Sequence, residues 1–232
     1  MHHPRSRQRR SAVARMLLLC LLAMVIPACT ATSRSDADAQ LRDAAGRGDV
    51  EAVREALDAG ADLEARDGQG RTALLLATHG NNVDAARELI EAGADVNAKD
   101  GMQDTPYLYA GAEGRTEILK LTLANGANLH DTNRFGGTAL IPAAEKGHPE
   151  NVRLLIAAGV DVDHVNKLGW TALLEAVILS DGGPIHQEIV RDLIAGGADV
   201  NLADGQGVTP LAHAKARGFV EIVRILEAAG AR

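Results

Sequence analysis

The spacing of apolar and polar residues over 138–161 predicts two short helices separated by a tight turn. The first helix follows Thr138, whose hydroxyl can accept a backbone N–H at a helix start, and it ends at Gly147. The second helix carries its apolar residues on one face and ends at Gly159. Glycine suits both ends because it adopts a left-handed backbone without a Cβ clash. Neither helix can bury its apolar face alone, so the stretch requires similar units on both sides.

The same pattern recurs along the chain with a period near 33 residues. Its glycine stops are spaced by 33, 33, 33, 38 and 33 residues, at Gly60, Gly93, Gly126, Gly159, Gly197 and Gly230. Its capping threonines share the single longer spacing, at Thr72, Thr105, Thr138, Thr171 and Thr209. This periodicity predicts an all-α repeat solenoid of about six stacked helix–turn–helix units. The predicted repeats are about 38–66, 67–99, 100–132, 133–165, 166–203 and 204–232.

Short sequences at matching positions of the repeats carry a second signal. Different repeats carry different parts of one pattern, which runs from Thr-Pro-Leu through Ala-Ala and Gly-His to Gly-Ala-Asp-Val-Asn. These parts are found at Thr105-Pro106, Thr209-Pro210-Leu211, Ala143-Ala144, Gly147-His148 and Gly197-Ala198-Asp199-Val200-Asn201. From residue 38 to the last residue, the chain resembles the ankyrin-repeat family. The resemblance implies helix pairs joined by hairpin fingers and a role as an interaction scaffold. It does not identify a partner.

Several local features depart from this pattern. The histidine of the family pattern is replaced throughout, by Leu75, Leu108, Ile141, Leu174 and Ala212. Pro142 lies one turn into its helix and should remove one backbone hydrogen bond there. Repeat 5 carries five extra residues within 180–187, and we expect His186 in that loop to be solvated. The first helix of repeat 1 is predicted over residues 38–45, with Asp36 or Asp38 as its cap.

The connections between repeats are predicted to be tight hairpin fingers. Asp-Gly or Asn opens the finger tips at residues 67–70, 100–103 and 133–136. These residue types tolerate the positive φ that such turns require.

The N-terminal 28 residues predict a signal peptide. Five arginines and no acidic residue lie in this segment, and an unbroken apolar run covers residues 16–26. A run of that length is too short to span a bilayer, which takes about 20 residues, but it fits the core of a signal peptide. The residue pair Arg9-Arg10 suggests a twin-arginine signal, but the residues after it fit that pattern poorly.

The end of this segment, Ile26-Pro27-Ala28-Cys29, resembles a bacterial lipobox. The resemblance implies that Cys29 is lipidated and that residues 29–37 form a short tether on the periplasmic side of the envelope. Thr30 stands where an aspartate would retain a lipoprotein at the inner membrane, which favours the outer membrane. Ordinary cleavage after Ala28 or Ala31 is the alternative.

Charge bears on the class of partner. Removal of residues 1–28 leaves 19 basic against 31 acidic residues, a net charge of −12. Such a domain repels phosphates and anionic lipid, so we expect no nucleic-acid partner and membrane contact only through the anchor. The negative charge of the domain should raise its rate of association with a basic partner. We expect a monomer.

No motif in the sequence predicts catalysis, a metal or a cofactor. Gly68-x-Gly70-x-x-Ala73 imitates a dinucleotide fingerprint but falls on a finger, without the strand that this motif needs. Asp95-x-Asn97 and Asp199-x-Asn201 resemble the start of a calcium loop, but their following glycines come one place late. The histidines include no closely spaced pair typical of zinc sites.

A set of large apolar residues maps to the concave face through which ankyrin-family proteins bind partners. Counting from each capping threonine places them on the fingers and first helices of repeats 3–5, at Met102, Tyr109, Phe135, Leu168 and Trp170. Ile178 and Leu179, beside the inserted loop, extend the set. We predict a partner-binding surface here, because apolar residues with a polar rim are typical of interface centres. Local packing of Phe135 and Trp170 onto neighbouring fingers is the alternative.

Together these features favour a non-enzymatic protein-binding scaffold in the bacterial cell envelope. One version is an accessory or assembly factor for another exported protein. An enzyme that uses the repeat 5 loop, around Asp181 and His186, is a second hypothesis, and a purely structural spacer is a third.

Overall fold

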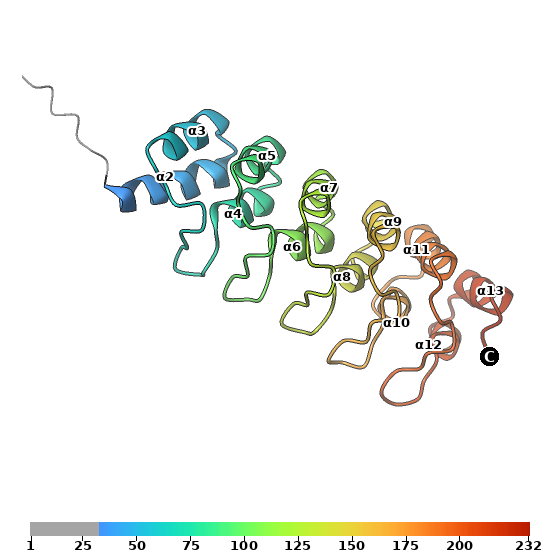
Figure 1. Ribbon diagram of the computed structural model, residues 1–232. Helices are drawn as coiled ribbons and strands as arrows, with labels where there is room; N and C mark the ends of the chain where they lie inside the picture. The colour runs from blue at the N-terminus through green and yellow to red at the C-terminus, as the bar shows by residue number, and fades with distance from the viewer. Residues whose placement is uncertain (1–32) are drawn as a thin grey trace, which may run out of the picture. The chain divides into compact units, whose positions relative to one another are not determined.

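The computed structural model describes residues 33–232, and residues 34–232 form one compact unit. Twelve α-helices lie in the described part, in six antiparallel pairs that stack in chain order (Figure 1). The first helices of the pairs are α2 (Arg34–Arg47), α4 (Ala73–His79), α6 (Pro106–Ala112), α8 (Leu140–Glu145), α10 (Ala172–Ile178) and α12 (Pro210–Arg217). The second helices are α3 (Val50–Asp58), α5 (Val83–Glu91), α7 (Thr116–Ala124), α9 (Pro149–Ala158), α11 (Pro184–Ala195) and α13 (Val220–Ala228). The predicted all-α solenoid of six repeats is confirmed.

The core runs without interruption through the stack. One buried residue recurs two places after each capping threonine, at Leu74, Tyr107, Leu140, Leu173 and Leu211, and Leu41 fills that place in repeat 1. Each first helix packs against the first helices of its neighbours, and each second helix does the same. Stability therefore comes from contacts between neighbouring repeats, since a single pair leaves its apolar sides uncovered.

Four of the five predicted threonine caps form. The hydroxyls of Thr72, Thr105, Thr171 and Thr209 accept the backbone N–H three residues on, at 3.3, 3.0, 3.2 and 3.3 Å. The prediction for Thr138 is wrong: helix α8 begins later, at Leu140, and its first turn has no side-chain cap.

Pro142 explains this exception. In the other repeats the carbonyl of the capping threonine accepts an N–H four residues on, as Tyr109 donates to Thr105 at 2.9 Å. Proline has no N–H, so the Thr138 carbonyl instead accepts the N–H of Ile141 at 3.3 Å. That N–H is the group which the threonine hydroxyl would otherwise bind. The Thr138 hydroxyl is left buried with no partner among residues 33–232.

The start of repeat 1 differs from the prediction. Helix α2 begins at Arg34, within the stretch that was predicted to be tether. Asp38 does not cap it, because Asp38 lies inside the helix and its carboxylate accepts the N–H of Asp62 at 2.7 Å. Ala37 in the extra turn is fully buried, so the helix covers apolar surface here.

The fingers project on the same side of the stack (Figure 1) and are tight turns, without strands in residues 33–232. Each opens on an Asp or Asn whose side-chain oxygen accepts the N–H groups two and four residues on, at Asp67, Asp100, Asn133, Asn166 and Asp204. Positive φ falls on the fourth finger residue instead of the opening pair, at Gly70, Gln103, Gly136, Gly169 and Gly207.

The extra residues of repeat 5 are fixed to both neighbouring repeats. Imidazole Nε2 of His186 lies 3.0 Å from the carbonyl of Glu145, and Arg217 donates to the carbonyl of Ser180 at 2.8 Å. The expectation of a solvated histidine is therefore wrong, since His186 is half-buried and joins α11 to α8. The insertion lengthens α11 to twelve residues.

No helix within residues 33–232 is both long and apolar enough to cross a membrane. The predicted signal peptide and the lipidation site at Cys29 lie outside the described residues.

Candidate partner-binding groove

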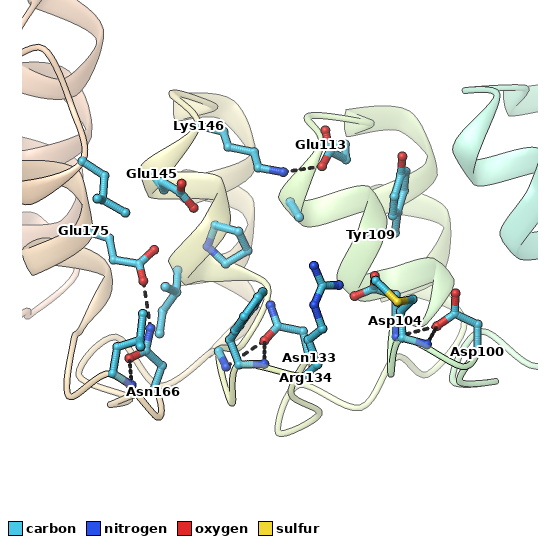
Figure 2. A pocket seen from close by; sticks show the side chains of 18 of the residues that line it. Asp100, Asp104, Tyr109, Glu113, Asn133, Arg134, Glu145, Lys146, Asn166 and Glu175 are labelled. Atoms are coloured by element: carbon cyan, nitrogen blue, oxygen red, sulfur yellow. Dashed lines mark hydrogen bonds and ion pairs between the residues drawn. The ribbon is translucent and has the colours of Figure 1, made fainter. Parts of the chain in front are cut away.

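A groove of about 580 Å³ lies over the fingers and first helices of repeats 3–5 (Figure 2). Five of the seven residues predicted to bind a partner line it: Met102, Tyr109, Phe135, Leu168 and Leu179. Three come from separate fingers, Tyr109 lies on α6, and Leu179 directly follows α10. The stack therefore brings the predicted residues into one surface.

The geometry of the fingers explains why their apolar residues face outward. Met102, Phe135 and Leu168 each follow a finger-opening Asp or Asn by two residues and donate their N–H to its side chain, at 2.8–2.9 Å. This bond fixes the backbone at the tip, and the side chains remain 48%, 51% and 53% exposed. These three large apolar side chains form one row and are half-exposed. Burying this row under a partner is favourable, because it removes apolar surface from water.

Trp170 and Ile178 do not line the groove, and both are partly buried. Trp170 lies at the base of its finger, where its N–H donates to Asn166 at 3.1 Å and its carbonyl accepts the Asn166 N–H at 3.0 Å. The partial burial of Trp170 agrees with the alternative of local packing, whereas Phe135 is exposed. A partner-binding role for Trp170 and Ile178 stays a prediction.

His79 forms the repeat 2 end of the groove and was not predicted. Its ring stacks on Tyr109 with centroids 3.9 Å apart and an interplanar angle of 10°. Burial lowers the pKa of His79, and the charge of Arg71 lowers it further. His79 is therefore mainly neutral at pH 7 and gives an aromatic wall to the groove.

The middle of the groove contains charges of both signs. Lys146 forms an ion pair with Glu113 across the first helices α8 and α6. The Arg134 guanidinium lies 4.5 Å from the Phe135 ring centroid, within reach of a cation–π interaction. Burial raises the pKa of Asp104, Asp100 adds to this effect, and Arg134 opposes it.

The repeat 5 end of the groove contains two carboxylates from neighbouring first helices, Glu145 on α8 and Glu175 on α10. Figure 2 shows both side chains on neighbouring helices at this end of the groove, with the Glu175 carboxylate bonded to Asn166. Glu175 is only 5% exposed and accepts one hydrogen bond, from Nδ2 of Asn166 at 2.8 Å. Burial raises its pKa to about 7, the Glu145 charge acts in the same direction, and the Asn166 bond opposes both.

The sequence-based prediction of the binding surface did not include Glu145 and Glu175, because it was built on apolar residues only. The signal was available in part: Glu175 occupies the fifth position of its helix, as Tyr109 does in repeat 3. The burial of Glu175 and its bond to Asn166 depend on the packing of α8 against α10, which no single repeat encodes.

The inserted loop borders a second, smaller hollow of about 160 Å³. It contains the pair proposed for catalysis, with Nδ1 of His186 3.6 Å from Asp181. Nε2 of His186 faces the Glu145 carbonyl, which can only accept, so Nε2 carries the proton of that bond and Nδ1 is the acceptor nitrogen of the neutral ring. The hydroxyl of the adjacent Ser180 is bonded to the Gly182 N–H instead of to the imidazole. No cluster of three or more potential metal ligands lies within residues 33–232.

The geometry defines a class of protein: a stacked helix–turn–helix scaffold with a groove across its fingers and first helices. The family model for ankyrin repeats (3 copies) matches residues 41–133 and 107–204. This chain belongs to the ankyrin-repeat family.

Individual relatives agree with this assignment. The putative ankyrin repeat protein YahD of Escherichia coli strain K12 is 44% identical over 57 residues, which are 25% of this chain and 28% of that relative. The crystal structure of an ankyrin repeat domain from Acinetobacter baumannii AYE is 58% identical, with a TM-score of 0.80, and the match covers 83% of this chain and 98% of that one. The ankyrin repeat domain of Bcl-3, a member of the IkappaB family, is 29% identical, with a TM-score of 0.74 and coverage of 83% and 86%.

Proposed function

We propose that this protein is a scaffold of the bacterial cell envelope that binds a partner protein through the groove of repeats 3–5. Ankyrin repeats are generally protein–protein interaction modules, which gives the class of function. The observation that carries the proposal for this surface is the row of half-exposed apolar side chains at Met102, Phe135 and Leu168. Exposing such residues in water is unfavourable, and interface centres are built from them.

The proposal places the protein on the periplasmic side of the envelope. A basic segment followed by an apolar run and a lipobox-like sequence supports export and a lipid at Cys29. A scaffold held in this way acts close to its membrane, and one version of the proposal is an accessory or assembly factor for another exported protein.

Affinity capture from envelope extract tests the proposal. The bait is the protein purified from cells that produce the full chain, compared with a Phe135→Ala, Leu168→Ala variant. A matched control, Val220→Ala with Ile185→Ala, truncates two side chains that are 62% and 53% exposed outside the groove. Loss of about 2 kcal/mol of binding free energy at an interface centre weakens binding roughly thirtyfold. The groove variant should then retain no partner in the capture.

The proposal predicts one protein that is retained by the wild type and by the control but lost by the groove variant. Capture of the same proteins by all three baits would contradict it, because the groove would then contribute nothing to binding.

A further inference from the structure

We propose that the groove receives an apolar segment of a partner protein that also carries a lysine or arginine, and that this cation binds between Glu145 and Glu175. The inference rests on the proposed function, because it names the chemistry of the partner for the same groove. It follows from how apolar surface and charge are distributed along the groove.

Charge in the groove is unequal. Five carboxylates line it against two cations: Asp100, Asp104, Glu113, Glu145 and Glu175 against Arg134 and Lys146. Both cations act on repeats 3 and 4, where Lys146 pairs with Glu113 and Arg134 lowers the pKa of Asp104. Asp100, Asp104 and Glu113 share these two cations, so two of the three carboxylates in excess, Glu145 and Glu175, lie at the repeat 5 end.

At that end two carboxylates line the groove without a cation, and the charge of one acts on the other. Within residues 33–232, no lysine or arginine forms an ion pair with Glu145 or Glu175. Glu175 has one bond, from the neutral amide of Asn166. Glu175 is buried, Glu145 is partly buried, and the charge of Glu145 disfavours ionisation of Glu175. A cation placed between the two carboxylates offsets this repulsion and forms charge-assisted hydrogen bonds.

Apolar surface lies next to this acidic pair. Phe135, Leu168 and Leu179 line the same groove and are 51%, 53% and 47% exposed. A segment that covers them needs a large apolar side chain. Lysine and arginine also suit the position because their aliphatic stems pack on apolar surface while their charged heads reach the carboxylates.

The charge of the whole chain favours the same occupant. The sequence carries a net charge of −7, and this acidic field attracts a basic segment during encounter. A negatively charged segment would meet repulsion both at a distance and at Glu145 and Glu175.

A peptide selection tests the inference. A phage-displayed library of random 12-residue peptides is selected in parallel on three forms of the protein purified from cells that produce the full chain. These are the wild type, a Glu145→Gln, Glu175→Gln variant, and a charge-matched control, Glu55→Gln with Glu91→Gln, which alters exposed residues of the second helices α3 and α5. Glutamine keeps the size of the side chain and its carbonyl can still accept the bond from Asn166, so the variant removes charge alone.

We expect the wild type and the control to select peptides with a lysine or arginine close to a large apolar residue. The Glu145→Gln, Glu175→Gln variant should select apolar peptides without that cation. By fluorescence anisotropy, this variant should bind a selected wild-type peptide about tenfold or more weakly, and changing the peptide's cation to glutamine should remove the difference.

Two results would overturn the inference in distinguishable ways. If the selected peptides lack lysine and arginine but lose binding to the Phe135→Ala, Leu168→Ala variant, the cation site is wrong and the proposed function stands. If no peptide is enriched, or if enriched peptides bind that variant as well as the wild type, the groove is not the binding surface and both proposals fail.

Discussion

At the scale of single residues, the clearest physical signal is the buried carboxyl of Glu175. Its pKa in the folded chain is about 7, against an ordinary value of 4.5. A carboxyl with a raised folded pKa stabilises the fold when it is protonated. That contribution is fully present below about pH 4.5 and is lost as the pH rises through about 7.

The first prediction is that Glu175→Gln stabilises the protein at pH 8 and changes little near pH 4.5. Glutamine resembles the protonated carboxyl, so the variant avoids a cost of up to about 3 kcal/mol that the wild type meets on ionisation. Urea unfolding at both pH values measures the effect, with the exposed Glu55→Gln as the control. Equal differences between variant and wild type at the two pH values would show that Glu175 does not titrate as inferred.

The second prediction compares two threonines with different bonds. Thr105→Val should cost about 1 kcal/mol in the free energy of unfolding, because it removes a hydroxyl that caps α6 at 3.0 Å. Thr138→Val should cost nothing or stabilise slightly, because the Thr138 hydroxyl is buried without a partner in the described chain. Equal losses for the two variants in chemical denaturation would contradict the role assigned to Pro142.

At the scale of elements, the fingers share one construction but not one sequence. Four of the five have glycine at the position of positive φ, and the second finger, which opens at Asp100, has Gln103 with φ of +68°. A side chain at this backbone conformation costs roughly 1–2 kcal/mol, because its Cβ approaches a carbonyl oxygen. The finger that opens at Asp100 is therefore the strained member of the set.

The third prediction follows from this difference. Gln103→Gly should raise the free energy of unfolding by about 1 kcal/mol, because glycine has no Cβ. Gln103→Ala, which keeps the Cβ, serves as the control and should give no gain. A glycine variant no more stable than the alanine variant would show that the finger is not strained at this residue.

Elements were largely predictable from sequence, because their signals are local. Gly159 and Pro149 mark helix ends through backbone geometry that each residue imposes alone, and both lie where expected. The prediction was wrong where two residues affect the same backbone group. Because Pro142 has no N–H, the Thr138 carbonyl accepts the N–H of Ile141, which the Thr138 hydroxyl would otherwise accept. The prediction was also wrong for α2, whose first turn contains the fully buried Ala37.

At the scale of the whole molecule, the stack assembles a surface that no repeat contains. Met102, Phe135 and Leu168 share one position of the finger, so their alignment followed from the period alone. His79 and Glu175 were missed as site residues, since stacking on Tyr109 and burial between helices are properties of neighbouring repeats together. The repeat period therefore predicts the position of the surface, but it does not predict the charged and aromatic groups that contact between neighbouring repeats adds to it.

The fourth prediction concerns where the protein resides. Cys29→Ala should move it from the membrane fraction to the soluble periplasmic fraction, because no lipid can then be attached to the new N-terminus. Fractionation of cells that produce each form, with immunoblotting, measures the shift, and Cys20→Ala is the control within the predicted signal peptide. Identical fractionation of the Cys29→Ala variant and the wild type would contradict the anchor.

The most direct test of the central claim is photo-crosslinking in living cells with benzoylphenylalanine placed at position 135. Phe135 lies in the groove, and Val220, which is 62% exposed outside it, gives the matched control position. A scaffold that binds through the groove predicts a discrete crosslinked protein from position 135 and none from position 220. The same adducts from both positions, or an adduct from position 220 alone, would contradict the account.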